Sequence, residues 1–447
     1  MMGREEVLGP LRERTLENAQ VRLLVERYDL SRDSRLARAI VQQVNRELDA
    51  EERRRGVQRV RPGELLIRTG QGPLVLPRRT EEDLDRALAG ERWDVIRRDI
   101  VARCEARYRV LFPDAPRWQV EAFLRRLWPG TGHRVSGPKP SPVYGPRRER
   151  PWGSTRLTGE PLAALDAQRA RRWVERDPPR PAHRPETLAK LQAFLRNEAG
   201  MAPAVQEPML LDLMGLRARF CPRVSVLATG QMPLAAMHVD SGRSLWQPTR
   251  YQPLAPVIIT WITGEESRRL RRNPPRTYED LMERYGRRMG RAMVEAYTQD
   301  GLLSHMELQW IFLTSIATVS RALDWYQRQH QVILPCPGTV LDMGRTLTHK
   351  DLIVRLHLQG MSVLEIARHT YHHPRSVDAY LKAFDSVLIL HLYGLPPSLI
   401  ARALGRGETL VDEYLDLIDR HLKDVETMRD YLRGRGVRLP GALPHHA

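Results

Sequence analysis

The sequence predicts a mainly α-helical protein with a helical N-terminal unit, a mixed α/β middle region, and a C-terminal winged helix followed by tandem helix-turn-helix units. Three observations predict it. Apolar residues recur at spacings of three and four. The pattern "IARHTYHHPRSVDAYL" at Ile366 returns as "IARALGRGETLVDEYL" at Ile400. The 71 basic and 54 acidic residues give a formal charge of +17, which favours a polyanionic partner.

Changes in composition and pattern along the chain divide it into segments. The predicted segments are a helical N-terminal domain (1–130), a basic Pro-rich linker (131–184), a mixed α/β region (185–300), a winged-helix-like unit (301–346), a first helix-turn-helix unit (347–384) and a second, helix-turn-helix-like unit (385–440).

In the N-terminal domain, residues 15–55 and 80–128 have helical periodicity, and Thr80 with Asp83 can cap a helix. Between them, residues 63–77 predict a hairpin that turns at Gly70 and Gly72.

The linker combines many prolines with an excess of basic residues. Its arginines Arg147, Arg148 and Arg150 can lie along a phosphate backbone and gain affinity from displaced counterions. An ordinary solvated linker explains the composition equally well.

In the middle region, helices are predicted near 186–198 and 205–217, followed by a long helix from Thr277 toward Gln299. Between these helices, the pattern predicts short strands at 224–229, 235–239, 244–247 and 257–262.

The first helix-turn-helix candidate begins at Ser304, which forms a capping box with Glu307. A turn is predicted at 313–315, and the next helix places Val319 and Leu323 in the core. Its outward residues would contact DNA: Ala317, Thr318, Ser320 and Arg321. The run "TSIATVSRAL" resembles the recognition-helix region of repressor families that read the major groove, although Leu313 stands where those families usually have Gly and Gln309 where they usually have Ala.

Residues 331–344 contain two β-prone runs around Pro337 and Gly338, which predict a wing beside these helices. Arg345 and Lys350 could then contact the DNA backbone. A plain connecting hairpin is the alternative.

Each copy of the repeat predicts three helices, with Gly at a turn and apolar residues, such as Ile366 and Ala367, on the inner faces. In the first copy, Ser362 and Glu365 can cap the second helix. The first copy's third helix presents a set that we expect to face DNA: His372, His373, Arg375, Ser376, Ala379 and Lys382. The second copy instead presents Glu408, Thr409, Asp412, Glu413 and Asp416. Carboxylates repel phosphates, so we expect this copy to pack or form a homodimer.

The stretch from "LDMGRTLTHKDL" through "EIARHT" to "LVDEYLDL" resembles a prokaryotic family catalogued as domain of unknown function 1670. The resemblance covers roughly the last 250 residues. It implies a bacterial or archaeal host and supplies no catalytic residues.

Sequence motifs of common enzyme classes, such as GxxxxGK[ST], GxSxG and HExxH, do not occur. His369, His372 and His373 could bind a metal, but a polar cluster facing DNA suits their position in a helix turn better, so we expect no metal and no cofactor. The carboxylates of Asp212, Asp240 and Glu265 leave a transposase or recombinase as an alternative.

Cys104, Cys221 and Cys336 are too far apart in sequence for a local CxxC pair, which fits a reducing compartment. The N-terminus lacks an apolar signal region and no segment predicts membrane insertion, so a cytoplasmic location is expected. Together, these patterns predict a sequence-specific binder of double-stranded DNA, in the manner of a transcriptional regulator. An RNA- or protein-binding adaptor remains a second alternative.

Overall fold

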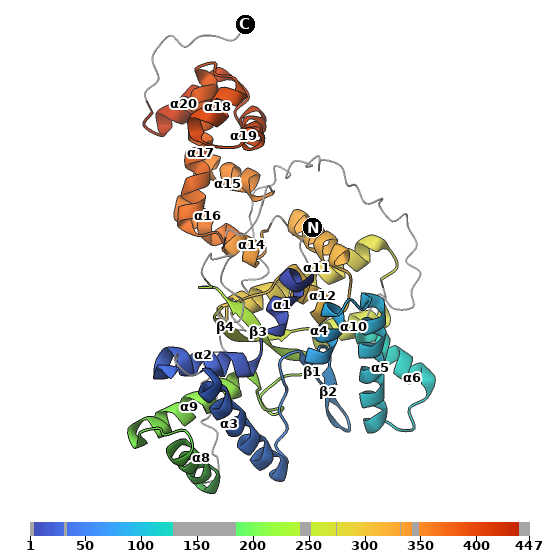
Figure 1. Cartoon of the computed structure of the whole chain (residues 1–447). Coiled ribbons are helices and arrows are strands. Elements are labelled where there is room, and N and C mark those ends of the chain that lie inside the picture. Colours follow the sequence, from blue (N-terminus) through green and yellow to red (C-terminus); the bar gives the residue numbers. More distant parts are fainter. Residues whose placement is uncertain are drawn as a thin grey trace. The chain divides into compact units, whose positions relative to one another are not determined.

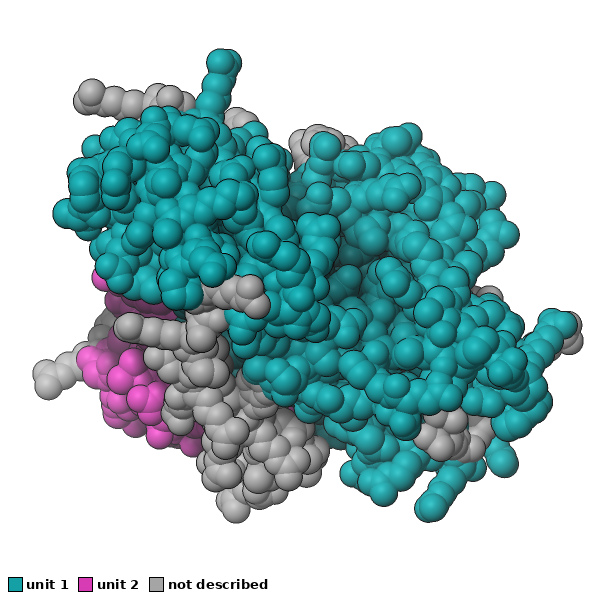
Figure 2. Space-filling model, turned by 90° about the horizontal axis from the view of Figure 1, so that it is seen from below, with its two compact units in different colours: residues 1–331 teal, residues 332–447 magenta. Residues whose placement is uncertain are grey.

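Helices account for most of the chain in the computed structural model (Figure 1), and the predicted mainly α fold with a mixed middle region is confirmed. The structure describes residues 4–30, 34–127, 185–241, 252–273, 275–330, 332–341 and 348–437. The chain divides into two compact units, 1–331 and 332–447, which Figure 2 shows in different colours. The division falls inside the predicted segment 301–346. Within the described ranges, no helix combines the length and apolar character needed to cross a bilayer.

The N-terminal part of unit 1 follows the predicted pattern. Its elements are α1 (Arg4–Arg12), α2 (Leu16–Tyr28), α3 (Ser34–Arg54), β1 (Glu64–Thr69), β2 (Gly72–Pro77), α4 (Glu81–Leu88), α5 (Trp93–Leu111) and α6 (Arg117–Leu127). The hairpin predicted at 63–77 is confirmed, because β1 and β2 pair antiparallel from Glu64 opposite Pro77 to Thr69 opposite Gly72. Thr80 and Asp83 form the predicted capping box at the start of α4.

In its described residues, the middle of unit 1 consists of four helices and a small sheet. It contains α8 (Pro185–Asn197), α9 (Pro203–Phe220), β3 (Gln231–His238), β4 (Leu254–Thr260), α10 (Gly264–Arg272), α11 (Tyr278–Tyr297) and β5 (Gly301–Leu302). The strands form an antiparallel sheet in the order β4-β3-β5. In Figure 1, α8 and α9 lie beside α3, and all three contribute to one buried apolar cluster with Ile40, Leu195 and Leu213 at its centre.

Two of the four predicted strands of this region lie in the sheet. Residues 235–239 overlap β3, and 257–262 overlap β4. Residues 224–229 form turns and bends instead, so that prediction was wrong. The fourth candidate, 244–247, lies outside the described residues, as do most of the predicted linker and its arginines Arg147, Arg148 and Arg150.

Unit 1 ends with α12 (His305–Phe312) and α13 (Ile316–His330), and α13 packs against α11. Val319 and Leu323 are buried as predicted. The predicted wing is wrong for the described part of its range, because residues 332–341 contain no strand and form the helical turn α14 (Pro337–Val340). Pro337 suits the first position of a helix as well as a turn, which is why the Pro-Gly signal was misread.

Unit 2 consists of helices. After α14 come α15 (Thr348–Leu358), α16 (Val363–Thr370), α17 (Pro374–Leu392), α18 (Pro397–Leu404), α19 (Glu408–His421) and α20 (Val425–Gly434). The first copy of the repeat is α15, α16 and the start of α17. The second copy begins within α17, so this helix belongs to both copies, and continues through α18 and α19.

Equivalent positions of the two copies have equivalent roles. Ile366 and Ile400 are both 0% exposed, and Ala367 and Ala401 are both 6% exposed. Gly360 and its counterpart Gly394, 34 residues later, end helices with φ of 91° and 78°, a conformation that glycine adopts without a Cβ clash. The sequence repeat is therefore a structural repeat with two linked cores.

Candidate nucleic-acid interface

The turn between α16 and α17 is set by local hydrogen bonds. Ser362 and Glu365 form the predicted capping box that begins α16. Tyr371 ends this helix in the left-handed conformation with φ of 55°. His373 caps α17 by accepting a hydrogen bond from the backbone N–H of Arg375 at 3.1 Å, and Pro374 occupies the first helical position. The residues expected to contact DNA are therefore held at the N-terminus of a well-capped helix.

Four of the six residues predicted on this face are exposed: His373, Arg375, Ala379 and Lys382. Lys382 forms an ion pair of 2.8 Å with Asp378 one turn earlier, where both side chains remain largely in solvent. Such a pair is weak, so it leaves the ammonium group available to a phosphate.

His372 and Ser376 are 4% and 5% exposed, so the prediction that they face DNA was wrong. The His372 ring turns inward beneath the turn, where Nδ1 lies 2.8 Å from the carbonyl oxygen of Thr370 and the ring meets that of Tyr380 edge to face. Ser376 lies beside Val377 on the inner face of α17. The buried side chains of His372 and Ser376 therefore pack beneath the turn rather than facing solvent.

Two exposed basic residues at the end of α16, Arg368 and His369, extend this face. Arg368 was not predicted, because the sequence argument considered only the third helix of each copy. The spacing gave a signal, since Ile366 and Ala367 are core positions, which places Arg368 on the opposite side of the helix and His369 at the flank. We call the set Arg368, His369, His373, Arg375, Ala379 and Lys382 the α16–α17 basic face.

Lys350 does not lie on this face, which corrects its predicted role at the DNA backbone. Its ammonium group pairs with Glu413 of α19 at 2.9 Å and lies 5.6 Å from the centre of the Tyr414 ring. It therefore joins the two copies. Arg345 lies outside the described residues.

The second copy has the charge predicted for it. Glu408, Thr409, Asp412 and Asp416 are exposed along α19, whereas Glu413 is half-buried beside Lys350. Arg402 and Arg406 precede this helix and are also exposed. At the 34-residue offset of the repeat, Asp416 takes the position of Lys382 and Thr409 that of Arg375.

The α12–α13 pair in unit 1 resembles the first copy in its local construction. Ser304 and Glu307 form the predicted capping box, and Leu313 makes the turn with φ of 48°. Ala317 and Arg321 are exposed, and Thr318 and Ser320 are half-buried. The Arg321 Nε donates to the backbone oxygen of Ala317 at 3.1 Å, and its guanidinium lies 5.9 Å from the centre of the Tyr278 ring.

A buried cluster fixes the end of α12. Arg78 and Arg288 lie on the Trp261 ring at 4.3 and 4.0 Å from its centre. Arg78 and the Trp261 indole N–H both donate to the backbone oxygen of Ile311, at 2.7 and 3.1 Å. Burial lowers the pKa of Arg78 to about 9 and that of Arg288 to about 10, so both remain cationic at neutral pH and attract the ring face.

The carboxylates considered for a metal site are not brought together. Asp212 on α9 accepts from the Tyr28 hydroxyl at 2.6 Å and pairs with Arg27. Asp240 follows β3 and is exposed, and Glu265 on α10 pairs with Arg269 of the same helix. In the part of the chain that the structure describes, no three His, Cys, Asp or Glu residues are grouped so as to hold a metal.

These features define the class: a mainly α-helical protein in which short helix pairs, each joined by a tight turn, present exposed side chains from the second helix. Residues 195–417 match the model of the family described as a protein of unknown function (DUF1670), and this segment belongs to that family. The resemblance predicted from the sequence is thereby confirmed. No curated protein and no solved structure matches the chain.

Proposed function

We propose that this protein is a sequence-specific DNA-binding protein that acts as a transcriptional regulator. The observation that carries the proposal is the α16–α17 basic face, where cationic and small side chains project from a capped helix above a buried core. The N-terminal part of such a helix fits the major groove, where Arg and Lys hydrogen bond to guanine or phosphate and Ala contacts a thymine methyl group. The α12–α13 pair, with Ala317 and Arg321 exposed, supplies a second contact.

Selection of bound fragments from a pool of random duplexes by the full-length protein tests the proposal. A recovered consensus sequence is the expected result. Failure to enrich any sequence, together with equal affinity for unrelated duplexes, would contradict sequence-specific binding. Preferential binding of single-stranded RNA, or no nucleic-acid binding at all, would favour the adaptor.

The repeat offers a matched pair of variants for this test. Arg368 and Arg402 are exposed and occupy equivalent positions 34 residues apart. Because acidic residues follow Arg402 on α19, we expect Arg368→Ala to weaken binding to the selected duplex by roughly tenfold, in line with about 1–2 kcal/mol for one charged contact. Arg402→Ala should leave the affinity within about twofold.

Fluorescence anisotropy with a labelled duplex measures both variants. Equal losses would mean that both copies contact DNA, and no loss in either would remove the α16–α17 basic face from the interface. The predicted homodimer through the second copy stays a prediction; sedimentation velocity of the full-length protein tests it.

A further inference from the structure

Unit 1 contains a cavity of about 890 Å³ that the proposed DNA interface does not use. Its walls come from the end of α1, the second half of α3, the segments 57–64 and 77–84, and the end of α9. This volume lies within the range of roughly 300–1,000 Å³ that holds small-molecule ligands in proteins. Seven arginines and six carboxylates of the described chain line it, so the partners of each arginine decide whether a cation is left for an anionic ligand.

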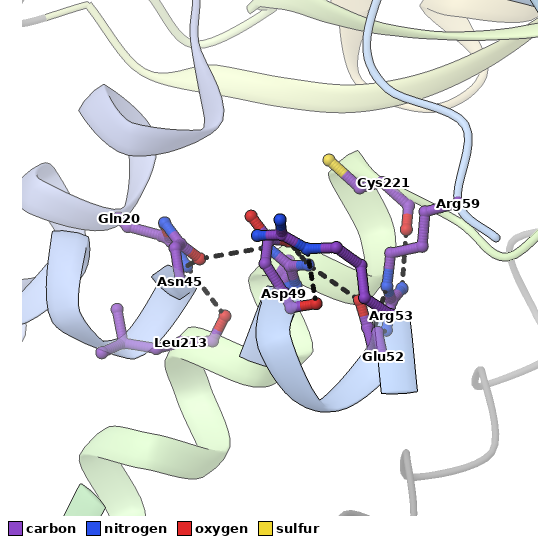
Figure 3. Close-up of polar contacts among 9 residues, drawn as sticks. Gln20, Asn45, Asp49, Glu52, Arg53, Arg59, Leu213 and Cys221 are labelled. Atoms are coloured by element: carbon purple, nitrogen blue, oxygen red, sulfur yellow. Dashed lines mark hydrogen bonds and ion pairs between the residues drawn. The ribbon is translucent and has the colours of Figure 1, made fainter. Parts of the chain in front are cut away.

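One wall of the cavity is fixed by a network of ion pairs (Figure 3). Arg217 pairs with Asp49 and, at 2.8 Å, with Glu52. Arg59 also pairs with Glu52 and donates to the backbone oxygen of Cys221 at 2.7 Å. Burial opposes ionisation of Glu52, but the hydrogen bonds from both arginines outweigh it and hold its pKa below the ordinary value. These charges are therefore already balanced, and the wall is rigid.

Two other arginines of the lining, Arg79 and Arg61, are not balanced in this way. Arg79 is half-buried, and within the described residues its guanidinium makes no hydrogen bond or ion pair. Burial lowers its pKa, which reflects the cost of holding a cation away from water without a partner. Arg61 is exposed at the same cavity. The charges of Glu307 and Glu81 offset part of the Arg79 charge, and Glu64 accepts a hydrogen bond from the backbone N–H of Arg61 at 2.8 Å. Among the described residues, none of these carboxylates forms an ion pair with either guanidinium.

The backbone makes room for Arg79. Gly63 has a φ of 86°, and a Cβ placed there would lie 3.1 Å from the Arg79 backbone oxygen and 3.3 Å from its Cβ. A larger residue at position 63 would push against Arg79. The glycine therefore lets Arg79 keep its position in the cavity wall.

The cavity is also connected to the α12–α13 pair. Arg14 lines it and forms a buried ion pair with Glu307. Glu307 is the residue that completes the capping box at the start of α12. Arg79 also interacts electrostatically with the Glu307 carboxylate. An anion beside Arg14 and Arg79 would therefore change the electrostatic balance at the first turn of α12.

We propose that this cavity binds a small anionic molecule, through a phosphate or carboxylate group paired with Arg79 and Arg61, and that its binding alters the stability of α12. The guanidinium fork matches either group with two parallel hydrogen bonds. The binding step does not depend on the proposed DNA-binding function. A regulatory effect of this binding on DNA affinity would rest on the proposed DNA-binding function.

Isothermal titration calorimetry of the full-length protein, at constant ionic strength, tests the binding step with inorganic pyrophosphate as the phosphate probe and citrate as the carboxylate probe. We expect saturable binding of at least one probe at one site, weakened roughly ten- to hundredfold in Arg79→Gln because one charge-assisted hydrogen-bonded pair is lost. Arg38→Gln, an exposed change of the same charge on α3 outside the cavity, should bind like the wild type.

Each other outcome overturns the proposal. Binding of neither probe removes the anion site, and equal weakening in Arg79→Gln and Arg38→Gln means that the probes respond only to the net charge. Thermal unfolding of both variants verifies that they are folded. Hydrogen–deuterium exchange of residues 305–312 with and without the bound probe tests the effect on α12 without DNA; unchanged exchange at saturation would contradict it.

Discussion

At the scale of single residues, Leu313 combines two opposing energies. It makes the turn between α12 and α13 in the left-handed conformation, which costs a residue other than glycine roughly 1–2 kcal/mol. Its side chain is also 0% exposed, and removal of a buried leucine side chain costs about 2–5 kcal/mol. Burial outweighs strain, which explains why this turn tolerates leucine where comparable turns use glycine.

The variant Leu313→Gly should therefore destabilise the protein, by about 1–3 kcal/mol, even though it relieves the backbone strain. Leu313→Ala is the control, because it loses nearly the same apolar contacts and keeps the strain. It should be less stable than the glycine variant by roughly 1 kcal/mol. Urea unfolding of the two variants measures the order, and a glycine variant at least as stable as the wild type would refute the explanation.

Single-residue predictions succeeded where helical periodicity decides the direction of a side chain, as at Val319, Leu323 and Ile366. They failed at His372, which precedes α17 and whose direction depends on backbone angles that no spacing rule gives. They also failed at Ser376, which lies in the first turn of α17 beside the buried Val377. The prediction for Lys350 failed for another reason. Its partner Glu413 lies 63 residues later, and a long-range ion pair leaves no local signal in the sequence.

At the scale of elements, capping residues were the most informative part of the sequence. The boxes at Thr80, Ser304 and Ser362 each begin a helix as predicted. The same signal at Thr263 and Glu266 begins α10, which we did not predict although the pattern was present. Strand predictions were less accurate, because a short β-prone run such as 224–229 forms a strand only when a partner strand lies beside it.

The two copies of the repeat are held together by polar contacts between α15 and α19 as well as by the shared helix α17. Asp351 on α15 is 3% exposed and accepts from His421 at 2.7 Å, with Arg420 at 3.4 Å. Burial opposes its ionisation, but the hydrogen bond from His421 and the nearby charges hold the pKa of Asp351 below the ordinary value.

This contact predicts a dependence of stability on pH. Because the pKa of Asp351 is lower in the folded than in the unfolded state, its contribution is fully present above the unfolded value of about 3.9 and is lost as pH falls through the folded value. Asp351→Asn should cost about 1–3 kcal/mol at pH 7. The difference from the wild type should shrink below about pH 4.

Scanning calorimetry between pH 7 and pH 3 measures this effect. Asp412→Asn, an exposed change on α19, is the control and should follow the wild type at every pH. A difference between Asp351→Asn and the wild type that stays constant over this range would exclude ionisation of Asp351 as the source.

At the scale of the whole molecule, the charge of +17 is unevenly placed. The α16–α17 basic face and Arg321 expose cations, whereas α19 exposes carboxylates. The net charge alone therefore predicts non-specific attraction to polyanions, and the distribution of charge is what led us to propose these two helix pairs as the DNA-contacting elements. Under that proposal, two pairs in separate compact units would let one chain contact two parts of a site.

The dependence of DNA affinity on salt tests whether both pairs engage at once. Each phosphate neutralised by a cation adds about 0.9 to the negative slope of log K against log salt concentration. If Arg321 and Arg375 each contact a phosphate of one bound duplex, Arg321→Ala and Arg375→Ala should each reduce the slope by about 1, and the double variant by about 2. If only unit 2 binds, Arg321→Ala leaves the slope unchanged. Anisotropy titrations between 50 and 300 mM salt, over which the Debye length shortens roughly 2.5-fold, measure the slope. A slope that neither substitution alters would exclude both arginines from the interface.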